Sequence, residues 1–135
     1  MNEMLPVAKR MLREHGEFFP YGGYMKPGGE IVHVGAKDPT TDRPKSKDLI
    51  AILQNSFLEL VRDKQCKAVA MVYDIVVPLP KSNRKSDAIQ VCVDHAGNYS
   101  AEVFFPYQIA NHEVIFGEVF AQEGKHLFFN DDEAD

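Results

Sequence analysis

The second half of the chain consists of strand-like segments joined by short loops, and this pattern limits the possible folds more than any other feature. Residues 68–77 are almost continuously apolar and β-branched, interrupted by Asp74, which is typical of a strand covered on both faces or nearly so. Residues 88–94 and 99–107 alternate apolar and polar side chains on either side of Gly97-Asn98. Because short loops join antiparallel neighbours, we predict consecutive hairpins.

Further strands are predicted at both ends of this block. Residues 114–122 and 126–129 extend the run of antiparallel strands, with Gly124 as the turn between them. Near the N-terminus, residues 17–25 and 30–34 form a hairpin around Lys-Pro-Gly-Gly.

Two amphipathic helices are predicted from apolar residues at helical spacing. In the first, apolar residues recur at positions 4, 7, 8 and 11, with Asn2 as N-cap and Gly16 as the stop. The second runs from a Ser46 cap to about Lys64. The expected fold class is α+β: one antiparallel sheet of about five to six strands with the two helices packed on one face, in the order α-β-β-α-β-β-β-β.

Length and charge predict one soluble domain. A chain of 135 residues with 44% hydrophobic and 26% charged residues builds a single core. The net charge of −5 argues against a nucleic-acid partner, and residues 130–135 contribute four of the acids. We therefore expect a domain over residues 1–129 and an acidic, disordered tail over 130–135. Without a signal-like or membrane-spanning stretch, the expected location is cytoplasmic, with no membrane partner.

Local motifs for cofactors are missing from the sequence. Cys66 and Cys92 do not have zinc-ligand spacing, and no two of the five histidines stand three or four residues apart. No nucleophile or phosphate-loop motif occurs. We therefore expect no cofactor, no metal site and no catalytic residue.

The hairpin formed by residues 88–94 and 99–107 yields the first candidate site. An odd-numbered loop keeps the apolar residues of both strands on one face and pairs Val93 with Val103, which sets Asp94 directly opposite Glu102. Like charges in that position repel. The pair would either share a proton or a cation, as a functional site does, or lie at a solvated hairpin end near a lysine.

The aromatic residues yield the second candidate site. Tyr21 and Tyr107 lie near predicted strand ends, where a phenol keeps its hydroxyl in water, and Phe104 lies beside Tyr107. Core packing explains many aromatic residues, but a sheet face carrying these three would form a docking surface.

Several segments together resemble a group of small uncharacterised bacterial proteins. They are Gly-Glu-Phe-Phe-Pro-Tyr-Gly at 16–22, Val-Tyr-Asp at 72–74, Asp-Ala-Ile at 87–89, Phe-Phe-Pro-Tyr at 104–107 and Phe-Gly-Glu at 116–118. The resemblance covers most of the chain and implies no activity. The order of elements is also similar to profilin-like, roadblock-like and secretion-chaperone-like folds, which are mostly protein-binding modules.

The sequence predicts a small non-catalytic binding module that docks a protein partner, or a second copy of itself, through a sheet face or edge. Its size and acidity fit an immunity-like or chaperone-like role. The alternative is an enzyme that binds a small molecule or a metal through the carboxylates of Asp94 and Glu102.

Overall fold

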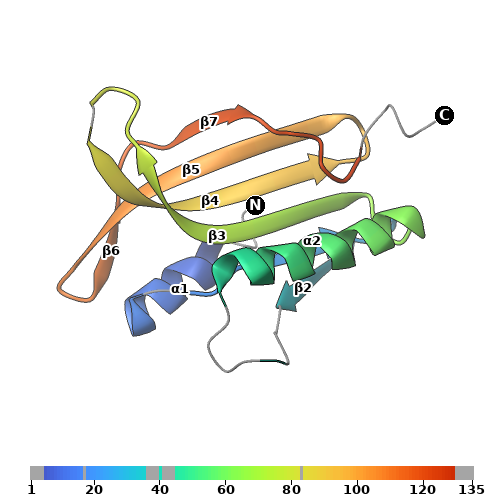
Figure 1. The fold of residues 1–135 in the computed structure, drawn as a ribbon, viewed down its shortest axis with the longest axis horizontal. Helices are drawn as coiled ribbons and strands as arrows, with labels where there is room; N and C mark the ends of the chain where they lie inside the picture. The colour runs from blue at the N-terminus through green and yellow to red at the C-terminus, as the bar shows by residue number, and fades with distance from the viewer. Residues whose placement is uncertain (1–4, 17, 36–39, 41–44, 83, 130–135) are drawn as a thin grey trace.

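The computed structural model describes residues 5–16, 18–35, 40, 45–82 and 84–129. Figure 1 shows two helices and a curved antiparallel sheet, which confirms the predicted α+β class. The elements are α1 (Leu5–His15), β1 (Tyr21–Met25), β2 (Ile31–Gly35), α2 (Ser46–Arg62), β3 (Ala68–Pro78), β4 (Lys85–His95), β5 (Tyr99–Ala110), β6 (Glu113–Phe116) and β7 (Phe120–Glu123).

The sheet is built from neighbouring hairpins, as the short loops predict. Its order is β2-β1-β3-β4-β5-β6, and β7 also pairs with β5. β6 pairs with positions 107–110 of β5, while β7 pairs with positions 101–104, so both lie along the same edge of that long strand. The structure has seven strands where five to six were predicted: the segment predicted as one strand over residues 114–122 is divided around Gly117 into β6 and β7, while residues 126–129 add no strand.

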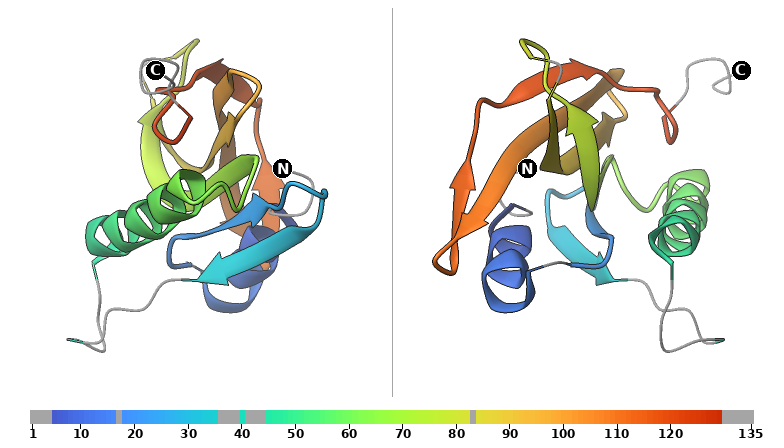
Figure 2. Two further views of the ribbon diagram at one scale, coloured as in Figure 1. Left: turned by 90° about the vertical axis from the view of Figure 1, so that its right-hand side faces the viewer. Right: turned by 60° about the vertical axis from the view of Figure 1, so that its left-hand side comes forward.

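The two helices lie on opposite faces of the sheet, so the prediction that both pack on one face was wrong. Val72 of β3 belongs to the core cluster that contains Leu12 of α1, whereas its neighbour Met71 belongs to the cluster that contains Phe57 of α2. Consecutive strand residues point to opposite faces, so the helices cover different faces. Figure 2 (right) shows α1 and α2 on either side of the β1–β2 hairpin. An apolar stripe on a helix predicts that the stripe packs against the sheet, but it does not predict which face of the sheet the helix covers.

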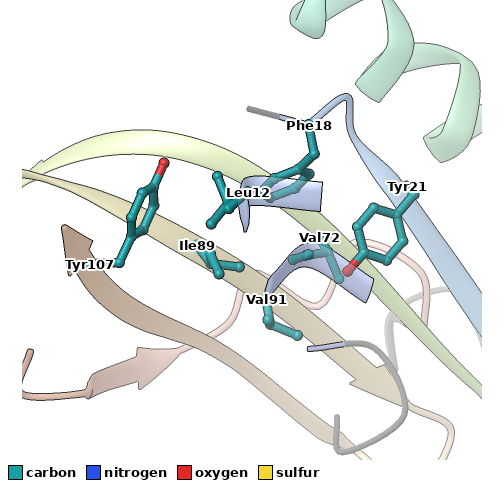
Figure 3. Close-up of a cluster of buried hydrophobic side chains, with 8 residues drawn as sticks. Leu12, Phe18, Tyr21, Val72, Ile89, Val91 and Tyr107 are labelled. Carbon is teal, nitrogen blue, oxygen red and sulfur yellow. The ribbon is translucent and has the colours of Figure 1, made fainter. Parts of the chain in front are cut away.

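The core on the α1 face is formed by aliphatic side chains flanked by aromatic rings. Leu12 meets Val72, Ile89 and Val91 of the two central strands. In Figure 3 the rings of Tyr21 and Tyr107 lie on either side of these side chains. The face of the sheet under α1 is therefore a packed core.

Two predictions at helix caps and chain ends were wrong, and two more lie outside the described residues. Ser46 is the first helical residue of α2, and the N-cap is Lys45, which makes no side-chain capping bond. Residues 126–129 form no strand. The predicted Asn2 cap and the acidic tail over 130–135 lie outside the described residues.

Candidate functional site

Asp94 and Glu102 do not lie directly opposite each other as predicted, because the pairing of β4 with β5 is shifted by two residues from the predicted register. The loop is odd-numbered as predicted, but Asp94 faces Ser100 and Cys92 faces Glu102. A shift by two keeps every side chain on its predicted face. Asp94 and Glu102 are therefore diagonal neighbours on the α2 face, and neither opposes a like charge directly.

Both acids are buried in one cavity, here called the polar cavity, which has a volume of about 340 Å³. Its wall follows cross-strand rows on the α2 face: Met71, Cys92 and Glu102 in one, and Tyr73, Gln90 and Phe104 in the next. Gly124, Lys125, Leu127 and Phe128 line it as well, and Gln54 contributes from α2. The buried polar or charged residues of the described chain, Gln90, Asp94, Ser100 and Glu102, all line this cavity.

Asp94 ties the C-terminal segment to the sheet. Its Oδ1 accepts a hydrogen bond from Ser100 Oγ at 2.6 Å, and its Oδ2 accepts one from the backbone N–H of Phe128 at 2.9 Å. Ser100 Oγ in turn accepts from the backbone N–H of His126 at 3.2 Å. Residues 124–129, here called the strap, begin with a backbone hydrogen bond from Gly124 N–H to Ser100 O at 3.0 Å. Beyond Gly124, the strap is held by side chains where a strand would use a backbone ladder.

The remaining polar groups form a second network around a thiol. Tyr73 Oη lies 3.0 Å from Cys92 Sγ, and Gln90 Nε2 donates to the same sulfur at 3.4 Å. Glu102 Oε2 accepts from Gln122 Nε2 at 2.6 Å. Burial raises the pKa of the Cys92 thiol and of the Tyr73 phenol, so both groups are neutral at ordinary pH.

The three aromatic residues predicted to share a docking surface do not lie together. Phe104 is on the α2 face, where its ring stacks on Phe120 with centroids 4.9 Å apart. Tyr21 and Tyr107 are buried in the core under α1, and Tyr107 Oη donates to Asp74 Oδ1 at 2.7 Å. All three residues are packed inside the domain, so the predicted docking surface does not form.

A different surface remains uncovered, and sequence reasoning missed it. On the α1 face, beyond the end of the core, a hollow of about 460 Å³ is lined by residues that include Gly23, Met25, Ala68, Ala70 and Tyr99. Tyr99 is 57% exposed and Ile31, also at this hollow, is 37% exposed. We call this surface the open face. The signal in the sequence was that an 11-residue helix is too short to cover strands of 11 or 12 residues.

The described residues contain no group of three or more metal-ligating side chains. Within the same part of the chain, no helix is long and apolar enough to cross a membrane.

In comparisons with known proteins, no protein family, curated protein or solved structure matches this chain significantly. The resemblance to small uncharacterised bacterial proteins therefore stays a prediction.

Proposed function

We propose that the chain is a small non-catalytic binding domain that docks a protein partner on its open face, and that a second copy of the chain is the partner this surface fits. The observation that carries the proposal is the open face itself. A sheet face lined by apolar side chains is normally covered by another layer, and here α1 covers only part of it.

A second copy fits because the open face is complementary to itself. A twofold interface uses the same patch on both subunits, so the patch must contain both a protruding group and a recess. Tyr99 provides the exposed ring, and the small residues Gly23, Ala68 and Ala70 provide the recess. No Asp, Glu, Lys or Arg lines the hollow, so two copies meet there without like-charge repulsion despite the net charge of −5.

Sedimentation velocity over a range of concentrations tests the proposal. We expect the unmodified chain to form a concentration-dependent dimer, and Tyr99→Glu to weaken it at least about tenfold, because a charge would be buried in the apolar recess. Val119→Glu is the matched control, since Val119 is 47% exposed and does not line the open face. A wild-type chain that stays monomeric at all concentrations, or a dimer indifferent to Tyr99→Glu, contradicts the proposal.

The alternative of a carboxylate-based enzyme loses its original argument with the corrected register. Asp94 accepts two hydrogen bonds that hold the strap, which is a structural use of that carboxylate. The polar cavity still contains side chains with capacity for further hydrogen bonds.

A further inference from the structure

Two side chains that are good hydrogen-bond donors, Gln90 and Tyr73, both contact one thiol in the polar cavity. In the described part of the chain, the side chain of Gln90 makes one hydrogen bond, to Cys92 Sγ, and the Tyr73 hydroxyl lies against the same sulfur. A thiol sulfur is a weak acceptor, so an amide N–H and a phenol O–H gain little from it. An oxygen atom of a ligand would be a better acceptor for both groups.

An acceptor stands next to these donors on the same wall. Glu102 lies directly across from Cys92 on the neighbouring strand. It is also the diagonal cross-strand neighbour of Gln90, a distance that long side chains can bridge. Its carboxylate offers about four acceptor positions, and Gln122 Nε2 donates to one of its oxygens. Glu102 is only 6% exposed, so a ligand N–H that reached it would bind a carboxylate shielded from water.

The other lining residues restrict the charge, polarity and size of the ligand further. Asp94 and Glu102 are buried acids in the cavity, whereas Lys125, which also lines it, is exposed to solvent, so the balance of buried charge disfavours an anion. Met71, Phe104 and Phe128 provide apolar surface beside the polar wall. A volume of about 340 Å³ lies at the lower end of the range for small-molecule sites.

We propose that the polar cavity binds a small neutral molecule with a carboxamide group and an apolar body. The ligand carbonyl accepts from Gln90 and Tyr73, its N–H donates to Glu102, and its apolar body packs against Met71 and the phenylalanines. No bond is made or broken, since the Cys92 thiol is protonated in this environment and serves as part of the wall.

Benzamide and benzoate are a matched pair of probes, because they have the same shape and differ in charge and in the N–H donors. Titration of the uniformly ¹⁵N-labelled chain with each probe would be followed by amide shifts of the cavity-lining residues. We expect benzamide to shift these signals saturably and to bind at least about tenfold more tightly than benzoate. This comparison uses the unmodified chain and needs no variant to fold.

Variants then assign the contacts. Gln90→Leu removes the donor at similar size and is expected to weaken benzamide binding at least about tenfold, while Gln108→Leu, at an exposed position of β5, leaves it unchanged. Glu102→Gln reduces the preference for benzamide over benzoate. Absence of cavity shifts up to the solubility limit of benzamide, equal binding of benzoate, or unchanged binding by Gln90→Leu overturns the proposal.

Discussion

At the scale of single residues, Gly22 shows how one position sets the distance between a helix and the sheet. Two adjacent glycines suggest a turn, yet Gly22 and Gly23 lie inside β1. A Cβ atom at Gly22 would collide with the carbonyl oxygen of Ala70 and lie 3.0 Å from the ring of Phe57. Glycine is therefore needed there for space, so that α2 can lie against β1 and β3.

Replacement of Gly22 by alanine is expected to destabilise the domain by about 1–3 kcal/mol, because the added methyl group forces apart atoms that are already in contact. Urea unfolding measures the change. Gly35→Ala is the control, since a Cβ atom at Gly35 meets nothing within 4 Å and should change stability by less than about 0.5 kcal/mol. Equal stabilities of the two variants would contradict this account, because they would show that α2 moves away from the sheet without a cost in stability.

At the scale of elements, local sequence patterns located most strands and both helices but could not settle the strap. The apolar run Leu127-Phe128-Phe129 looks like a short strand, and periodicity cannot distinguish a strand from a tethered loop over so few residues. What decides its structure lies elsewhere in the chain. Asp94 accepts a hydrogen bond from the backbone N–H of Phe128, and the ring of Phe128 packs edge-on against Phe57 with centroids 6.0 Å apart.

Asp94→Ala is expected to release the strap. The substitution removes a charged acceptor from Ser100 and from the Phe128 N–H, and each such bond is worth about 1.5–3 kcal/mol. Hydrogen exchange should accelerate at the amides of His126 and Phe128 before the central strands open. Asp87→Ala, an exposed acid on the same strand, should leave both rates unchanged. Unchanged protection in Asp94→Ala would mean that packing alone holds the strap.

At the scale of the whole molecule, the sequence predicts the sheet better than it predicts its two faces. The continuous apolar character of residues 68–77 does indicate a strand covered on both sides, and the helices on opposite faces account for it. The predicted register, however, depended on a loop length that the pattern of apolar residues leaves uncertain by two. That difference separated Asp94 from its expected partner and brought Glu102 opposite Cys92.

Stability should fall in alkaline solution because the core under α1 contains buried phenols. Burial raises the pKa of Tyr21 from 10 to about 12, opposed by a hydrogen bond with the backbone of Ala8. Burial also raises the pKa of Tyr107. Between pH 10 and 12 the unfolded chain loses these protons while the native state keeps them, so the native state is favoured fully only below pH 10.

Urea unfolding from pH 9 upward should show a decrease in the free energy of unfolding of up to about 1.4 kcal/mol per pH unit for each such tyrosine. Tyr21→Phe should reduce this slope, because it removes one of the buried phenols. A flat profile above pH 10 would contradict the buried state of these rings.

The open face is most directly tested by the accessibility of its methyl groups to a soluble paramagnetic gadolinium chelate. In a dilute sample, the chelate should broaden the NMR signals of Ala68 and Ala70 strongly and leave those of Leu53 and Met71, in the core under α2, sharp. In a concentrated sample, the two alanine signals should become protected as a second copy covers them. Alanine signals that are equally broadened at both concentrations would contradict self-docking, and signals that are sharp at both would show that this face is never open.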